Sequence, residues 1–302
     1  MEQKEPEEPT PNQSGPTWIS ESIGDGVALA IRTGSCRAAV QSPVQQIEVH
    51  EGASALGDLY RLDGVAMAAM GDEFIYHENL VFPAALAHGA PRRVLVLGGG
   101  DGGSVRRLLR IPTVTDVQVV EIDPLVVQIT RTQLPAIQAA SLDDPRVSVT
   151  PMDAAGYFRT RADPGLFDLI LFDLTDPGGA AQPLYERPFL QDCRAHLSDG
   201  GLLALHTASP FYSLARVRAL LVELAQDFAV VRPYFFPAPL YGGWWGMVTA
   251  APWSDPATLT SATVDHRLAK WGLLDLDYYN GEVHVAQFAQ PNFLRRAIAL
   301  PE

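Results

Sequence analysis

The fold is decided by an apolar run that ends in a glycine-rich loop, Val94-Leu95-Val96-Leu97-Gly98-Gly99-Gly100-Asp101-Gly102-Gly103. The four apolar residues predict a strand that is buried on both of its faces. A short helix is predicted over 104–110, and it stops before Pro112 because proline interrupts a helix. A strand, a glycine turn and a helix in this order are typical of the first unit of a parallel α/β sheet.

Strand and helix patterns continue to alternate along the chain, which predicts an α/β fold with a doubly wound parallel sheet and right-handed crossovers. Before this region, short β-like runs broken by glycine and proline predict a small antiparallel sheet. Its clearest strands are 27–32, 46–50 and 58–62. In the larger sheet the predicted strands are 117–122, 147–150, 167–172, 202–205, 230–235 and 244–249, and the further helices are 125–134, 188–197 and 211–228.

The chain of 302 residues is therefore predicted to have three parts. Residues 1–16 are rich in glutamate and proline and are expected to form a disordered tail. Residues 17–75 are expected to form a small β domain, and residues 76–302 the larger α/β domain. The first residues lack the apolar core of a signal peptide, and no apolar run reaches the roughly 18–20 residues that span a bilayer.

Charge and cysteine content exclude several classes of function. The chain has 22 basic and 35 acidic residues, a net charge of −13, which argues against nucleic acid as a partner because phosphate contacts need a basic face. The electrostatic field of a chain with this negative charge favours a cationic ligand. The alternative is that the acidic residues only keep the protein surface soluble. Two cysteines cannot build a disulfide framework, so a reducing cytoplasm is the expected location.

Carboxylates follow several of the predicted strands. Glu121 and Asp123 end the second strand, Asp153 follows the third, and Asp173 and Asp176 follow the fourth. Ligands of open parallel sheets bind beyond the carboxyl ends of the strands, so these acids are expected to converge on one cleft. Any single one of them is more often a helix cap than a site residue.

The loop also matches G-x-G-x-x-G through Gly98, Gly100 and Gly103, with Glu121 at a distance suited to a ribose diol. This motif alone fits either a dinucleotide or a nucleoside. Asp101 favours a nucleoside that carries a cation, because a carboxylate inside the loop would repel a pyrophosphate. The alternative is that Asp101 faces solvent or caps the following helix. Asp173 and Asp176 suit base chemistry or an ammonium ligand, but they also suit a turn.

Other chemistries lack their signatures. H-E-x-x-H and clustered histidines are absent, so no metal site is expected, and G-x-S-x-G is absent too. Taken alone, His77, His206 and His284 are isolated and more often structural, and Cys193 is more often a packed thiol than a nucleophile.

Together these motifs resemble the spermidine synthases, a family of polyamine aminopropyltransferases. The resemblance runs in family order from about Trp18 to the C-terminus. It is carried by Leu62-Asp63-Gly64, Asp72-Glu73-Phe74-Ile75-Tyr76-His77-Glu78, the 98–103 loop, Glu121-Ile122-Asp123, Asp173-Leu174-Thr175-Asp176-Pro177, Tyr278-Tyr279-Asn280, Val283-His284 and Pro291-Asn292-Phe293.

The resemblance implies a β domain on a Rossmann-like, methyltransferase-type domain in a homodimer or homotetramer. It implies decarboxylated S-adenosylmethionine as co-substrate and no metal. A diamine, typically putrescine, would attack the propyl carbon next to the sulfonium, giving spermidine and methylthioadenosine. The expected location is cytoplasmic, with no membrane partner.

The resemblance also implies roles for individual residues. Asp173 matches the general base, Glu121 the acid that holds the ribose hydroxyls, and Asp153 the acid that reads the adenine amino group. Asp101 matches the residue facing the aminopropyl end. The remaining matches on the cofactor side are Gln45, Gly98, Gly100 and Ala154, and those on the acceptor side are Tyr76, His77, Asp176 and Tyr241.

This chemistry agrees with what the reaction demands. Alkyl amines are protonated near neutral pH, so the site must hold one ammonium end and deprotonate the attacking end, a task for two carboxylates. Four departures from the family lie on or near the acceptor side: Val44, His206-Thr207-Ala208-Ser209, Gln182 and Gly242-Gly243-Trp244-Trp245. They leave the amine open: putrescine, cadaverine, agmatine or spermidine. A methyltransferase that uses S-adenosylmethionine and a non-enzymatic relative are the alternatives.

Overall fold

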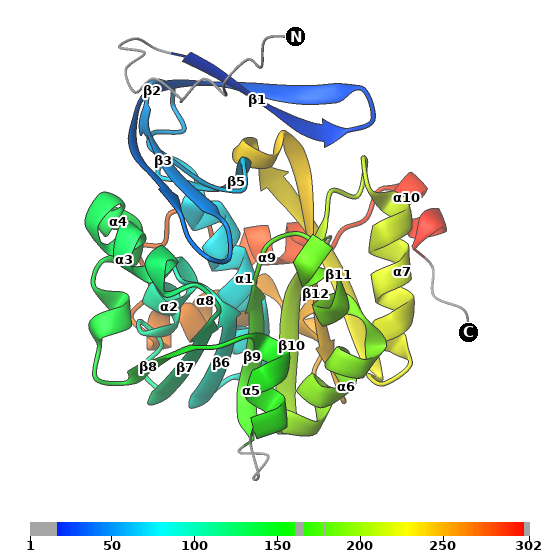
Figure 1. Cartoon of the computed structure of the whole chain (residues 1–302). Helices are drawn as coiled ribbons and strands as arrows, with labels where there is room; N and C mark the ends of the chain where they lie inside the picture. Colours follow the sequence, from blue (N-terminus) through cyan, green and yellow to red (C-terminus); the bar gives the residue numbers. More distant parts are fainter. Residues whose placement is uncertain (1–16, 161–165, 178, 299–302) are drawn as a thin grey trace, which may run out of the picture.

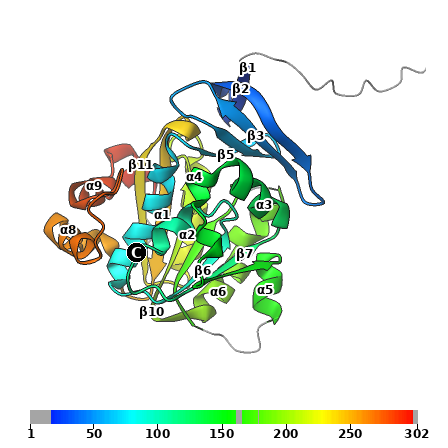
Figure 2. The ribbon, with the colours of Figure 1, turned by 90° about the vertical axis from the view of Figure 1, so that its left-hand side faces the viewer.

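The computed structural model describes residues 17–160, 166–177 and 179–298; the predicted tail 1–16 lies outside them. Two β-sheets make up the framework, and the smaller one lies across one end of the larger one (Figure 1). A quarter turn of the molecule shows the same arrangement (Figure 2). None of the helices in these ranges is both long and apolar enough to cross a membrane.

The smaller sheet is antiparallel, as predicted, with strands in chain order: β1 (Thr17–Gly24), β2 (Val27–Gln41), β3 (Gln46–Gly52), β4 (Leu59–Leu62) and β5 (Val65–Ala69). Strand β2 is much longer than the predicted 27–32. Its register against β3 shifts between Thr33 and Ala38, and such irregularities bend a strand without ending it. The predicted boundary at 75/76 falls inside helix α1 (Glu73–His88), and the division into domains stays a prediction.

The larger sheet has the order β11-β12-β10-β9-β6-β7-β8. Neighbours from β10 to β8 pair in parallel, whereas β12 is antiparallel to both β10 and β11. This is the predicted doubly wound fold, with the antiparallel hairpin of β11 and β12 at one edge of the sheet. The bounds are β6 (Arg93–Gly98), β7 (Asp116–Glu121), β8 (Val147–Pro151), β9 (Phe167–Asp173), β10 (Leu197–Ala208), β11 (Val230–Ala238) and β12 (Gly243–Ala251).

Helices cover both faces of the larger sheet. Along β6, Val94 and Val96 belong to an apolar cluster that includes residues of α1, α2 and α8, while Leu95 and Leu97 belong to a second cluster with residues of α5, α6 and α7. All four side chains are fully buried, as expected for a central parallel strand. The α-helices besides α1 are α2 (Gly103–Leu108), α3 (Pro124–Gln133), α4 (Pro135–Gln138), α5 (Ala154–Thr160), α6 (Arg187–His196), α7 (Leu214–Ala225), α8 (Ser261–Lys270), α9 (Gly281–Gln287) and α10 (Asn292–Ala297). Short 3-10 turns are η1 (Ser141–Asp143), η2 (Gly179–Tyr185), η3 (Pro239–Tyr241) and η4 (Pro256–Thr258).

Helix α7 is shorter than the predicted 211–228. The Ser209 hydroxyl accepts hydrogen bonds from the amides of Phe211 and Tyr212, each at 3.4 Å, which holds this segment in a turn before the helix begins. The apolar residues at 211 and 212 therefore belong to the loop after β10.

Strands β6 and β9 lie side by side, and their connections leave in opposite directions along the sheet. Gly98 and Asp173 are partners at the carboxyl ends of these strands. Gly98 has φ 79°, and a Cβ there would lie 2.1 Å from the Asp173 carbonyl oxygen, so only glycine fits. Ligands of doubly wound sheets bind at this reversal of strand order.

Candidate active site

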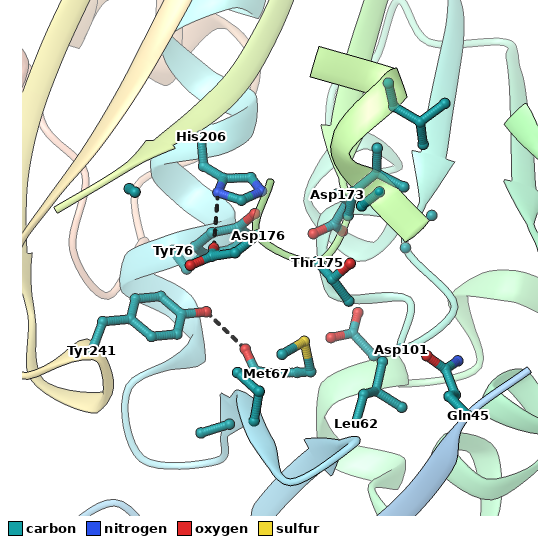
Figure 3. A pocket seen from close by; sticks show the side chains of 18 of the residues that line it. Gln45, Leu62, Met67, Tyr76, Asp101, Asp173, Thr175, Asp176, His206 and Tyr241 are labelled. Atoms are coloured by element: carbon teal, nitrogen blue, oxygen red, sulfur yellow. Dashed lines mark hydrogen bonds and ion pairs between the residues drawn. The ribbon is translucent and has the colours of Figure 1, made fainter. Parts of the chain in front are cut away.

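A cavity of about 500 Å³ lies between the two sheets at this point. The residues to which the resemblance gave roles all line it: Gln45, Tyr76, His77, Gly98, Gly100, Asp101, Glu121, Asp153, Ala154, Asp173, Asp176 and Tyr241. Asp123, which was expected to converge on the same cleft, does not line it; its side chain is buried at the start of α3. Figure 3 shows Gln45 and Asp101 at one end and Tyr241 and His206 at the other. The acids that follow separate strands thus share one cavity, while their individual roles stay predictions.

Glu121 lies next to the glycine loop, at the end of the cavity that also contains Gln45. Its two carboxylate oxygens accept the amides of Asp123 at 2.9 Å and Gly100 at 3.2 Å. Burial raises the pKa of Glu121 to about 7 despite these two hydrogen bonds. Gln45 reaches this end from the smaller sheet by donating to Asp123 at 3.2 Å. Asp123 itself caps α3 by accepting the Leu125 amide, which is the capping role that strand-end acids often have.

Asp153 and Ala154 stand where β8 passes into α5. One Asp153 oxygen accepts the Gly156 amide at 2.9 Å, in the manner of a helix cap. Arg159 lies 3.7 Å from the other oxygen, and the side chain is half exposed. Asp153 therefore both caps a helix and lines the cavity, so the two alternatives from the sequence are compatible.

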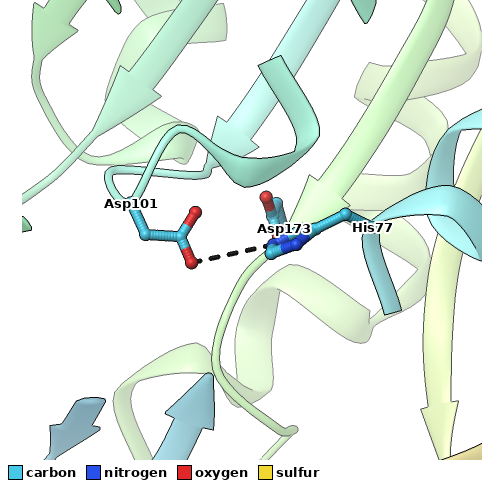
Figure 4. Close-up of side chains that lie close together, drawn as sticks. All are labelled: His77, Asp101 and Asp173. Carbon is cyan, nitrogen blue, oxygen red and sulfur yellow. Dashed lines mark ion pairs between the residues drawn. The ribbon is translucent and has the colours of Figure 1, made fainter. Parts of the chain in front are cut away.

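The centre of the cavity holds His77, Asp101 and Asp173, which point toward one another (Figure 4). Nδ1 of His77 lies 2.6 Å from Glu73 Oε2, and Nε2 lies 3.7 Å from Asp101 Oδ2. Burial alone would lower the pKa of His77, but Asp101 and Glu73 raise it to about 10, so the ring is a cation at neutral pH. The same ion pair overcomes the effect of burial on Asp101 and lowers its pKa.

Asp173 is the acid of this group best suited to accept a proton. Burial, followed by the charge of Asp101, raises its pKa to about 6. Ser104, at the start of α2, donates to Asp173 Oδ2 at 2.6 Å and fixes the carboxylate. A base with a pKa just below neutrality is ionised at pH 7 and still binds a proton readily.

These three side chains offer ligand atoms within 4.8 Å of one another, an arrangement that a metal ion can use. Both ring nitrogens of His77 face carboxylates, those of Glu73 and Asp101. The expectation of no metal stays a prediction.

The opposite end of the cavity is aromatic. The rings of Tyr76 and Tyr241 meet edge to face with centroids 6.0 Å apart, and Tyr241 lies 4.4 Å from Trp245. The Tyr241 hydroxyl donates to the Met67 carbonyl of β5 at 2.7 Å, which joins the two sheets across the cavity. Such walls pack methylene groups and attract cations. Asp176, half exposed, provides the negative charge at this end.

His206 is not the isolated structural residue expected from the sequence alone. It lies toward the carboxyl end of β10, is 1% exposed and lines the cavity. Nε2 lies 2.6 Å from the Tyr185 hydroxyl, and Nδ1 lies 3.4 Å from Asp176 Oδ1. The resemblance had already placed it among the departures on the acceptor side, and its position near the carboxyl end of a parallel strand is the signal that supports this.

Sequence reasoning also missed Ser104 and Glu73. Ser104 donates a hydrogen bond to Asp173. Glu73 forms ion pairs with His77, Arg106 and Arg107. The spacing of Glu73 and His77, four residues apart on one helix, was available as a signal.

The fold and this acidic cavity define an α/β enzyme of the Rossmann-like, methyltransferase type. Residues 73–258 match the family model described as spermine/spermidine synthase domain. A polyamine aminopropyltransferase of Nitrosomonas europaea is 38% identical over 97% of this chain and 89% of its own length, and one of Halorhodospira halophila is 34% identical over 92% and 99%. A crystal structure of spermidine synthase in complex with the transition-state analogue AdoDATO is 32% identical, covers 97% of this chain and 98% of its own, and has a TM-score of 0.86. The chain belongs to the spermine/spermidine synthase family and is an aminopropyltransferase.

Proposed function

We propose that this enzyme transfers the aminopropyl group of decarboxylated S-adenosylmethionine to a diamine, with putrescine as acceptor, and releases spermidine and methylthioadenosine. The observation that carries the proposal is the cluster of Asp101, Asp173 and Asp176 along one cavity that begins at Glu121. The related spermidine synthase bound to AdoDATO supports a nucleoside donor of this kind.

The cavity has chemistry suited to each part of the donor. Both Glu121 oxygens keep acceptor capacity for ribose hydroxyls, and Asp153 can accept from an exocyclic adenine amine. Asp101 and Asp173 favour the sulfonium and its aminopropyl amine. The carboxylate of S-adenosylmethionine itself would meet these acids at close range, and like charges in a cavity repel strongly, which argues against methyl transfer.

In the proposed reaction, the amine nitrogen of the acceptor attacks the propyl carbon attached to sulfur. The new N–C bond forms as the C–S bond breaks, and the electron pair stays on sulfur, which leaves as the neutral thioether of methylthioadenosine. Asp173 takes the proton from the attacking nitrogen. His77 contributes by holding Asp101, and the aromatic walls at Tyr76 and Tyr241 align the methylene chain.

The test is an amine panel. The purified full-length protein is incubated with decarboxylated S-adenosylmethionine and putrescine, cadaverine, agmatine or spermidine, and methylthioadenosine is measured by mass spectrometry. Release with putrescine as the preferred amine is expected. A parallel set with S-adenosylmethionine provides the control. Methyl transfer in that set, or no release with any amine, contradicts the proposal and favours the methyltransferase or the non-enzymatic relative.

The predicted homodimer or homotetramer and the cytoplasmic location belong to the same proposal. Light scattering coupled to size-exclusion chromatography gives the molar mass of the purified protein, which distinguishes a monomer of this chain from a dimer or a tetramer.

A further inference from the structure

Tyr60 is a buried residue of β4 whose hydroxyl has no partner. The residue is 2% exposed, and its hydroxyl oxygen forms no hydrogen bond within residues 17–160, 166–177 and 179–298. Buried tyrosine hydroxyls are usually paired, because removing a polar group from water without a compensating hydrogen bond costs free energy. Tyr60 also lines the cavity, so a bound molecule can supply the missing partner.

The ring of Tyr60 has a fixed place between the two sheets. Its neighbours across the smaller sheet are Val49 on β3 and Ala68 on β5. These residues form one apolar cluster with Val126 of α3 and Ile137 of α4. Because side chains in a packed interior keep one rotamer, we expect the hydroxyl to keep its place whether or not a ligand is bound.

Nearby charges place this hydroxyl close to the acids assigned to the donor. Burial raises the pKa of Tyr60 well above its ordinary value, and the charge of Glu121, followed by that of Asp101, adds to this effect. In the proposed function, Glu121 holds the ribose and Asp101 faces the aminopropyl end. The sulfonium is bonded to the ribose carbon on one side and to the propyl chain on the other, so it belongs between these two acids.

A tyrosine hydroxyl has chemistry suited to a sulfonium. Its oxygen presents lone pairs to the positive sulfur and to the C–H groups that the sulfur polarises. An uncharged oxygen also adds no third negative charge beside Glu121 and Asp101, which already repel each other enough to raise the pKa of Glu121 further. The apolar cluster around the ring suits the methyl group on sulfur.

We propose that the Tyr60 hydroxyl contacts the sulfonium of the donor and makes the enzyme bind the charged donor in preference to a neutral thioether. The inference rests on the proposed function and adds to it a specificity residue from the smaller sheet. The attraction is lost when the C–S bond breaks, because sulfur keeps the electron pair and becomes uncharged. Tyr60 therefore favours donor binding and product release and does not lower the barrier of the bond-breaking step.

The test compares two ligands that differ only at sulfur. They are decarboxylated S-adenosylmethionine and decarboxylated S-adenosylhomocysteine, a thioether that lacks the methyl group and the charge. Each is titrated calorimetrically into the purified full-length protein without an amine. Tyr60→Phe is expected to weaken binding of the sulfonium about three- to tenfold, as for the loss of one polar contact, while binding of the thioether changes less than about twofold.

Tyr234→Phe is the matched control. Tyr234 is also buried, does not line the cavity, and donates to the Asn79 carbonyl at 2.9 Å. Pro83, four residues further along α1, has no amide to replace this donor. Tyr234→Phe is therefore expected to bind both ligands like the unaltered chain but to unfold at a lower temperature. Tyr60→Phe removes an unpaired hydroxyl, so its thermal midpoint without ligand is expected not to fall.

The possible results separate the inference from the proposed function. Equal weakening of both ligands by Tyr60→Phe places the hydroxyl on the ribose or the amine and overturns the inference. Sulfonium binding as tight as in the unaltered chain overturns it too. A thermal midpoint that falls as far as that of Tyr234→Phe would show a hydroxyl already paired within the protein, with the same consequence. If the unaltered chain binds neither ligand, the proposed function itself fails.

Discussion

The two ends of the cavity are built in different ways. At the nucleoside end, parallel strands and their loops supply the acids, and backbone amides already hold them, as with Glu121 between Gly100 and Asp123. At the acceptor end, side chains come from both sheets, and polar atoms such as Nδ1 of His206 and Nε1 of Trp245 are buried without hydrogen bonds among the described residues. The comparison indicates that the fold fixes the nucleoside end, while individual side chains determine the acceptor end.

Asp173 lies between the nucleoside end and the acceptor end of the cavity. Substituting it is therefore the strongest test of whether turnover and nucleoside binding depend on different residues. Asp173→Asn is expected to lower kcat by about a thousandfold, because a positioned base contributes 10²–10⁴ to a rate. Methylthioadenosine binding is expected to stay within about threefold, measured by calorimetry. The thermal midpoint should not fall, since a buried acid whose pKa is raised to about 6 destabilises the folded chain when ionised. Turnover close to that of the unaltered chain would remove Asp173 from its proposed role.

Glu121→Gln is expected to affect the nucleoside end alone. The loss of a charge-assisted hydrogen bond should weaken methylthioadenosine binding by about 1–3 kcal/mol, read by calorimetric titration. Since the pKa of Glu121 is about 7, the affinity of the unaltered chain should rise as the pH passes upward through 7, and the variant should lose this dependence. Unchanged affinity in Glu121→Gln would mean that the ribose is held elsewhere.

The smallest effect concerns pH. A carboxylate base must be ionised, so kcat/KM should fall about tenfold per unit as the pH drops below 6, the pKa of Asp173. The Ser104 hydroxyl stabilises the ionised form, so Ser104→Ala should move this limb to higher pH. Rate profiles of both proteins, with Glu121→Gln as control for the second titrating acid, provide the measurement. A limb that moves to lower pH in Ser104→Ala would contradict the assignment.

The nucleoside end and the larger sheet could be predicted from one rule, that ligands of a parallel sheet bind at the carboxyl ends of its strands. Apolar strands that end in Gly98, Glu121 or Asp173 bring their last residues to one edge, whatever lies between them in sequence. The fold class was confirmed for this reason, including the family's small antiparallel sheet. Helix ends and the length of β2 were wrong by several residues, since a hydroxyl in a turn and shifts in strand register leave little trace in hydrophobic periodicity.

The acceptor end could be predicted only through the resemblance to a family, because its residues meet only in three dimensions. Met67 and Tyr241 belong to a strand of one sheet and a turn of the other, and no spacing in the sequence relates them. His206 appeared isolated because its partners Tyr185 and Asp176 come from other segments.

The close approach of Gly98 to the Asp173 carbonyl sets a limit for protein engineering. Because a methyl group at residue 98 would separate the two central strands, libraries randomised there should return only glycine, and the donor loop and base will be inherited as a unit.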